Sequence, residues 1–286
     1  MRRAADEARY LVNRGYPKDS AIRFVCDHHR LPEESRFVLT RIIVAATLAY
    51  FRRAKAQSPE SLRSNVVFVD GYNVLITTES LLAGYPVYLC DDGFMRDTRG
   101  IFSSYKISHL TAPALSDVLD LLAEAEPVHV EVLLDRQMSR SGELAELVRG
   151  MMAGRGLPGT ARTAGNVDHL LKVSEAVVAT SDGNVIDAAK RIYDLPAEIA
   201  KRKGIVPIFV GEFAEKMDNF RDPRTRSWSW AAAWHSFVLL VRQETFIERS
   251  CRYERFLLVN RQRASRADYP VHINRHLFMV LLIIIL

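Results

Sequence analysis

The sequence is poor in cysteine. It contains only three, Cys26, Cys90 and Cys251, which are odd in number and far apart. This pattern argues against a disulfide framework and against a zinc site, which needs ligands paired at short spacing. The N-terminal segment MRRAADEARYLV has no apolar core of signal-peptide length. Both features favour a reducing, cytoplasmic environment.

Long apolar runs are also scarce. The C-terminal segment, 276–286, contains an apolar run of ten residues, Leu277 to Leu286. A helix that spans a bilayer needs about 20 such residues, so we expect no membrane span. The run is predicted to be a terminal strand or a partner-facing segment, with a tail anchor as the alternative.

Common nucleotide-binding motifs are missing as well. The sequence has no GxxxxGK[ST] motif, which weighs against a P-loop NTPase, and no GxGxxG after the first predicted strand, which weighs against a dinucleotide-binding domain. A haloacid-dehalogenase-type phosphatase needs a second aspartate two residues after its nucleophile. Tyr72 stands at that place after Asp70.

Positive charge is present but unevenly distributed. Residues 1–65 carry 13 Lys or Arg and 7 Asp or Glu, a net +6, and residues 221–286 carry 11 and 5, again +6. Residues 66–220 carry 15 and 22, a net −7. Basic flanks suit a polyanionic partner, because Lys and Arg neutralise phosphates and release counterions. Two ordinary solvated surfaces are the alternative.

Three regions are predicted along the chain. Residues 1–57 form an all-helical N-terminal domain, 64–215 an α/β domain, and 221–286 a basic extension rich in Arg and aromatic residues. The N-terminal domain is predicted to hold three helices, the last over 31–56. Its helix–turn–helix stretch, 19–52, is interpreted either as a nucleic-acid-binding element or as a helical lid or dimer surface.

The α/β domain is predicted from strands that alternate with amphipathic helices. This order favours a mostly parallel sheet with helices on both faces, and such sheets bind ligands beyond the carboxyl ends of their strands. The segments predicted as strands are 66–70, 86–92, 127–136, 176–180 and 204–211.

Aspartates follow three of these strands, namely Asp70, Asp135 and Asp182. If the strands are neighbours, like charges converge at one edge of the sheet, which is costly unless a cation lies among them. A hard ion such as Mg²⁺ or Mn²⁺ suits such oxygen ligands and would support phosphodiester hydrolysis. The alternative is that each aspartate only caps the helix after its strand.

Further polar residues are predicted near the same edge. Asp168 opens a helix that leads into the Asp182 strand, and Lys172 follows it by one helical turn. Asp187 lies on the next helix. Asn73 follows Asp70 by three residues, and its amide is suited to orient a phosphate or a metal-bound water.

The stretch VFVDGYNVL resembles the first strand of NYN domains, which are PIN-like metal-dependent ribonucleases, and VDHLLKVSEAVVATSDGNVID is similar to their second half. The resemblance covers roughly 64–212. It implies a PIN/NYN-like α/β fold and an RNA-cleaving site. A helical unit joined to such a domain resembles an uncharacterised prokaryotic, largely archaeal, family. By this resemblance the catalytic residues are Asp70, Asn73, Asp168, Asp182 and Asp187, of which Asp70, Asp168 and Asp182 hold Mg²⁺ or Mn²⁺.

Several alternatives stay open at this stage. Residues 90–107 are an insertion whose charged side chains contribute to the site or form a polar loop; they are Asp91, Asp92, Arg96, Asp97 and Arg99. Asp135 is a more remote member of the site. The leading hypothesis is an RNA-cleaving nuclease, the second is a weak or inactive RNA-binding or assembly module, and the third is a small-molecule phosphohydrolase. Self-association into a homo-oligomer also stays open.

Overall fold

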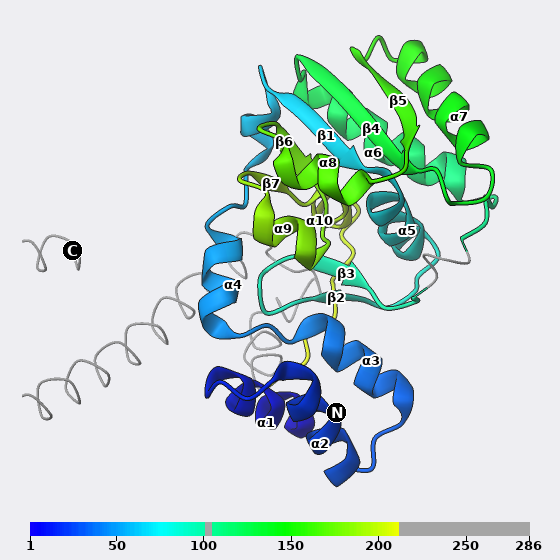
Figure 1. Cartoon of the computed structure of the whole chain (residues 1–286). Coiled ribbons are helices and arrows are strands. Elements are labelled where there is room, and N and C mark those ends of the chain that lie inside the picture. The colour runs from blue at the N-terminus through cyan, green and yellow to red at the C-terminus, as the bar shows by residue number, and fades with distance from the viewer. Residues whose placement is uncertain (101–104, 212–286) are drawn as a thin grey trace, which may run out of the picture. The chain divides into compact units, whose positions relative to one another are not determined.

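The computed structural model describes residues 1–100 and 105–211 (Figure 1). The helical N-terminal part and the α/β part belong to one compact unit. The predicted C-terminal extension, 221–286, with its apolar run Leu277–Leu286, lies outside the described residues. Within the described part of the chain, no helix is both long and apolar enough to cross a bilayer.

The N-terminal part is all-helical, as predicted, but it has four helices instead of three: α1 (Arg2–Asn13), α2 (Lys18–His28), α3 (Glu33–Ile42) and α4 (Ala46–Arg53). The expected long third helix is interrupted after Ile42. There the Val44 N–H donates to Asp91 Oδ2 at 3.1 Å, and the Asp91 N–H donates to the Ile42 carbonyl at 3.0 Å. The Val44 N–H and the Ile42 carbonyl, which would form hydrogen bonds within a continuous helix, are thus bonded to a loop of the α/β part.

The α/β part is built on a five-stranded sheet in which every pairing is parallel, which confirms the predicted fold class. The strand order is β5 (Gly159–Ala164), β4 (His129–Asp135), β1 (Val66–Asp70), β6 (Val177–Ala179) and β7 (Ile192–Tyr193). The strand that ends at Asp70 therefore lies at the centre, with the strands before Asp135 and Asp182 on either side.

Helices cover both faces of this sheet (Figure 1). On one face pack α5 (Gly71–Leu82), α6 (Thr111–Ala125), α7 (Ser141–Gly154) and α10 (Leu195–Arg202). On the other pack α8 (Val167–Val173) and α9 (Gly183–Ala188). Alternation along β1 serves both cores, because Val67 and Val69 join the first and Phe68 contacts the second.

Helix α5 is not among the elements that the sequence predicts, and its segment contains β-branched residues, which lower helix propensity. The helix is stabilised by tertiary packing, because most of its side chains are buried. It begins directly after Asp70. Gly71 permits this close start. A Cβ there would lie 2.8 Å from the Leu133 carbonyl oxygen, closer than side chains approach a backbone oxygen.

Two predictions about strands were incomplete or wrong. Segment 204–211 is not a strand of the sheet, because Ile208 makes only an isolated bridge to Tyr88, and β7 is the edge strand instead. The predicted strand 86–92 is shortened to β2 (Val87–Leu89), which lies outside the main sheet and forms an antiparallel hairpin with β3 (Met95–Asp97) of the insertion. In Figure 1 this hairpin lies between the sheet and the N-terminal helices.

Candidate active site at the carboxyl edge of the sheet

Asp70 is the central residue of this edge. It ends β1 and directly precedes α5, and only 7% of its surface is exposed. The Thr180 hydroxyl donates to Asp70 Oδ2 at 2.8 Å. Among the described residues, no Lys, Arg or His side chain forms an ion pair with Asp70. It is a buried carboxylate whose charge has no positive partner within the described part of the protein.

The electrostatics of Asp70 follow from this position. Burial raises the pKa of Asp70 to about 7, and the negative charges of Asp182 and Asp168 push it in the same direction, against the Thr180 hydrogen bond. The fold therefore brings the charges of three predicted site residues close enough to affect one another. At neutral pH their mutual repulsion would be relieved by a proton or a cation.

Asn73 lies on the first turn of α5 and faces the loop after β6. Its Oδ1 accepts hydrogen bonds from the Ser181 N–H at 2.8 Å and the Ser181 hydroxyl at 3.0 Å. These bonds fix the side chain and assign its oxygen. No hydrogen bond of the Asn73 NH₂ group to another described residue is present, so that group remains a free donor at the edge.

Asp182 fulfils the capping alternative, whereas Asp135 forms a local turn and does not cap α7, which begins at Ser141 after the N-cap residue Arg140. Asp182 caps α9, because its Oδ1 accepts from the backbone N–H groups of Asn184 at 2.8 Å and Val185 at 3.2 Å. Asp135 Oδ1 accepts from the Gln137 N–H at 2.8 Å. In both residues these hydrogen bonds use one carboxylate oxygen, Oδ1, and leave Oδ2 able to face the edge.

Asp168 is far more exposed than Asp70. It lies in the first turn of α8 with two-thirds of its side chain exposed. Its Oδ2 is 3.9 Å from Lys172 Nζ, as predicted from the spacing along the helix. An exposed side chain with one distant partner can change rotamer at little cost, so Asp168 is free to turn toward Asp70.

Asp187 is not brought to Asp70 in this way. Both of its oxygens are bound by Arg52 of α4, with Nε–Oδ1 at 2.7 Å and Nη2–Oδ2 at 2.8 Å. A two-point ion pair of this kind fixes the carboxylate firmly. Asp187 thereby links α9 to the N-terminal helices, and the catalytic role that the resemblance implies for it stays a prediction.

Arg52 belongs to a buried ionic network that sequence reasoning missed. Asp92, with no exposed surface, binds Arg52 Nη1 at 2.8 Å and both terminal nitrogens of Arg96 at 2.8 Å. Arg96 Nε also donates to the Ser181 carbonyl at 2.6 Å. The network thus holds the loop that carries Thr180 and Asp182. No local sequence pattern predicts this network, because its residues are far apart along the chain.

The charged residues of the insertion hold the structure together. Asp91 pairs with Arg9 of α1, where Nη2–Oδ1 is 2.8 Å. Asp97 accepts from the Thr77 hydroxyl at 3.3 Å and from the Arg99 N–H at 3.0 Å. These contacts favour a structural role for residues 90–99 over direct membership of the Asp70 site.

The described side chains around Asp70 have the chemistry of ligands for a hard cation, but they are not grouped as a metal site. All side-chain donors around Asp70 are oxygens, as Mg²⁺ and Mn²⁺ prefer. In the arrangement described for residues 1–100 and 105–211, no three His, Cys, Asp or Glu side chains are grouped closely enough to hold an ion. The chemistry of the donors fits a hard cation, and binding would require Asp168 and Asp182 to turn toward Asp70.

Two domain families match adjacent parts of the chain. Residues 1–55 match a protein of unknown function (DUF434), and residues 59–198 match a domain of unknown function (DUF5616). The boundary between the matches falls in the linker between α4 and β1.

One relative establishes the family. The chain is similar to the uncharacterized protein MJ0935 of Methanocaldococcus jannaschii, with 34% identity over 200 residues, which is 69% of this chain and 95% of that protein. The chain therefore belongs to the same family as MJ0935. No solved structure matches the present chain.

Proposed function

We propose that this chain is a cytoplasmic ribonuclease that hydrolyses RNA phosphodiester bonds at Asp70. The observation that supports the proposal is the state of Asp70: a buried carboxylate at the carboxyl edge of a parallel sheet, without a cationic partner among the described residues, whose pKa is raised to about 7. Unpaired buried carboxylates are costly and are a feature of functional sites.

Each residue of the edge has a role in this proposal. Asp70, Asp168 and Asp182 would hold Mg²⁺ or Mn²⁺, and the bound ion would supply an activated water and stabilise the departing oxygen. The NH₂ group of Asn73 donates to a phosphate oxygen. Thr180 orients Asp70 through its hydrogen bond of 2.8 Å. Asp187 acts only through its pairing with Arg52.

The test is an RNA cleavage assay. Purified protein is incubated with labelled single-stranded and structured RNAs, with Mn²⁺ or with EDTA, beside Asp70→Asn and the matched control Asp120→Asn. Asp120 lies on α6 and pairs with Arg155, away from the edge. We expect cleavage only with Mn²⁺, by the wild type and Asp120→Asn. Cleavage that survives EDTA or Asp70→Asn contradicts the proposal.

A second candidate is an RNA-binding or assembly module of the same fold. The observation that favours it is the absence, among the described residues, of three carboxylates grouped as a metal site, with Asp187 held by Arg52. RNA binding by both wild type and Asp70→Asn, with no products at any Mn²⁺ concentration, would select this candidate.

A further inference from the structure

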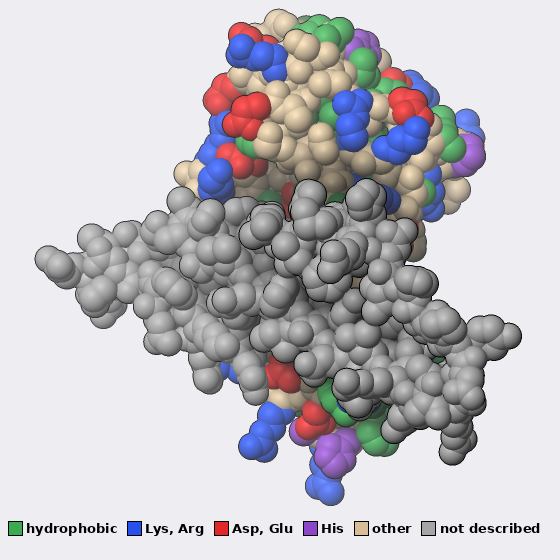
Figure 2. Space-filling view, turned by 90° about the vertical axis from the view of Figure 1, so that its left-hand side faces the viewer, with side chains coloured by type: hydrophobic (Ala, Val, Ile, Leu, Met, Phe, Trp, Pro, Cys, Tyr) green, Lys and Arg blue, Asp and Glu red, His purple; other side chains and the backbone are tan. Residues whose placement is uncertain are grey.

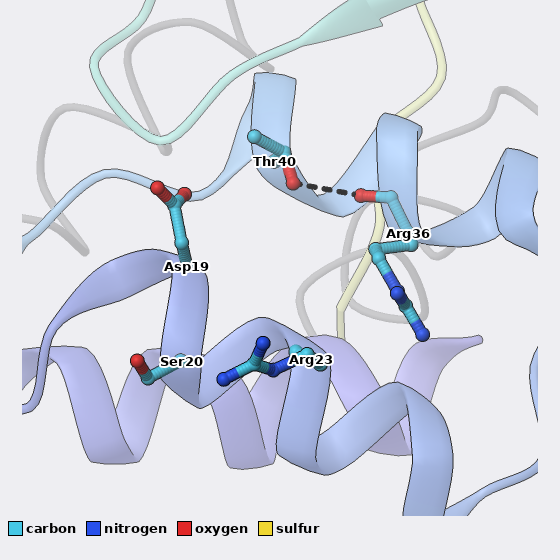
Figure 3. Close-up of a pocket in the computed structure, with 5 residues that line it drawn as sticks. All are labelled: Asp19, Ser20, Arg23, Arg36 and Thr40. Carbon is cyan, nitrogen blue, oxygen red and sulfur yellow. Dashed lines mark hydrogen bonds between the residues drawn. The ribbon is translucent and has the colours of Figure 1, made fainter.

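A pocket lies between two N-terminal helices, apart from the Asp70 edge. Its volume is about 380 Å³, within the range of about 300–1,000 Å³ that is usual for small-ligand sites. It is lined by Asp19, Ser20 and Arg23 from α2 and by Arg36 and Thr40 from α3, which surround one space (Figure 3). Nothing described above gives these side chains a role.

The pocket has cationic donors that the protein does not satisfy. Arg23 makes no hydrogen bond or ion pair with any other described residue. Arg36 donates from Nη2 to Asp27 Oδ1 at 2.7 Å, and 41% of its side chain is exposed. Two accessible guanidinium groups that line one space can donate together to an oxyanion.

The start of α2 adds neutral donors. This helix of eleven residues begins at Lys18, after Pro17, and has no side-chain cap, so the N–H groups of its first turn lack helical partners. No hydrogen bond of the Ser20 hydroxyl to a described residue is present. Together with Arg23 and Arg36, these donors have the chemistry that binds a phosphate.

Asp19 shows that the ligand is more than a phosphate. Its carboxylate lines the same space and repels a free anion. It can accept a hydrogen bond from a hydroxyl group, and the ribose 2′-hydroxyl lies next to the phosphate in RNA and is missing from DNA. We propose that the α2–α3 pocket binds one nucleotide of an RNA strand, with its phosphate on Arg23 and Arg36 and its 2′-hydroxyl on Asp19. The assignment to RNA rests on the function proposed above.

The charges of the surface are consistent with a local site. On the face shown in Figure 2, Lys and Arg of the α/β part are interspersed with Asp and Glu and form no uniform basic field. A strand that ran over such a surface would need a few defined contacts to hold it. The pocket provides one such contact on the N-terminal helices.

The test measures RNA binding without cleavage. Anisotropy of a fluorescein-labelled single-stranded RNA of about 12 nucleotides, within the span of common single-strand sites, is recorded in EDTA for the wild type, Arg23→Gln and Arg3→Gln. Arg3 is an exposed arginine of α1 outside the pocket, so Arg3→Gln is the matched charge control. We expect Arg23→Gln to weaken binding roughly tenfold and to reduce the slope of log Kd against log salt by about 0.7.

A second variant tests the ribose contact. We expect the wild type to prefer RNA to DNA of the same sequence. Asp19→Asn is expected to reduce this preference severalfold while DNA binding stays equal or improves, because a repulsive charge is removed. A preference that is unchanged in Asp19→Asn overturns the assignment of the 2′-hydroxyl.

The outcomes separate this proposal from the nuclease proposal. If Arg23→Gln and Arg3→Gln bind RNA alike, the pocket assignment is overturned, whereas cleavage that depends on Asp70 would stand. If Asp70→Asn loses cleavage and keeps binding while Arg23→Gln loses binding, both stand. If inorganic phosphate raises the Tm of the wild type but not of Arg23→Gln, and no RNA binds, the RNA assignment is overturned.

Discussion

Asp70 and Asp92 are both aspartates shielded from water, but their surroundings have opposite effects. Asp92 binds two arginines, Arg52 and Arg96. Burial raises the pKa of Asp92, but the charges and hydrogen bonds of these arginines outweigh burial and lower the pKa below its usual value. Asp70 has no cationic partner among the described residues, only hydrogen bonds from the Thr180 hydroxyl and the Asn73 backbone, and burial together with two like charges raises its pKa to about 7.

This difference separates a structural carboxylate from a candidate functional one. The charge of Asp92 is fully compensated, so it joins α4, the β2–β3 hairpin and the loop after β6. The charge of Asp70 is left uncompensated by the described residues. An uncompensated buried charge does not stabilise the fold. We therefore infer that Asp70 serves binding or catalysis and not stability.

The largest effect is expected from breaking the compensated site. Asp92→Asn leaves Arg96 buried without its counter-charge and should lower the free energy of unfolding by about 3–5 kcal/mol. Urea unfolding followed by circular dichroism measures the change. The control is Glu143→Gln, which removes a fully exposed pair with Arg140 and should leave unfolding as in the wild type. Equal stability of Asp92→Asn and the wild type would mean that the network does not hold the fold together.

The sequence predicts one of these two sites well. Asp70 is recognisable because an apolar strand ends in a carboxylate, and Asp135 and Asp182 follow two other predicted strands in the same way. That these two strands are the neighbours of β1 is known only from the structure. The parallel sheet, α6 and α7 follow from the same periodic patterns. What the sequence leaves undetermined is which oxygen of each carboxylate is already used, since capping by Asp182 depends on the turn into α9.

The Asp92 site could not be predicted, because its energy comes from contacts that are distant in sequence. Arg52 meets Asp92 40 residues away and Asp187 135 residues away. A polar loop and a structural ion network have the same local composition. Helix α5 was missed for a related reason: tertiary burial overrides the strand preference of Ile76, Thr77 and Thr78.

A third buried carboxylate, Asp194, has hydrogen-bond donors but no ion pair among the described residues, and its contribution to stability is expected to depend on pH. It accepts from the backbone N–H groups of Met95 at 2.7 Å and Ala197 at 3.0 Å, and burial raises the pKa of Asp194 to about 6. Because the unfolded state loses its proton first, near pH 4, the charged carboxylate destabilises the fold as pH rises. Relative to Asp194→Asn, the wild type should lose about 2 kcal/mol between pH 4 and pH 7.

Urea unfolding of both proteins at several pH values measures this difference. The stabilising contribution of the protonated form is complete below about pH 4 and lost above about pH 6–7, so the difference should be flat from pH 7 to 8. A difference that is constant from pH 4 to 7 would show that Asp194 titrates normally.

Asp70→Asn should change the free energy of unfolding in the opposite direction from Asp92→Asn, although both variants replace an aspartate by an asparagine. The amide keeps an oxygen that accepts from Thr180 and removes the uncompensated charge. In EDTA at pH 8 we expect the free energy of unfolding to increase by about 1 kcal/mol. Urea unfolding of the two variants side by side measures the contrast. A loss as large as that of Asp92→Asn would make Asp70 a structural residue and remove the main support for a nuclease.

The smallest effect is expected at Asp168, where the pairing is weakest. Lys172 Nζ is 3.9 Å from Asp168 Oδ2 on an exposed helix face, so Lys172→Gln should change stability by less than about 0.5 kcal/mol. The same variant removes a cation that competes for a carboxylate of the proposed metal set. The Mn²⁺ concentration needed for half-maximal cleavage should therefore fall about twofold, since one nearby exposed charge is worth about 1 kcal/mol or less in water. The matched control is Lys201→Gln, whose partner Glu198 lies on α10 at 3.4 Å and outside the edge. An equal response of both variants would assign the change to net charge and would leave Asp168, like Asp187, outside the metal set.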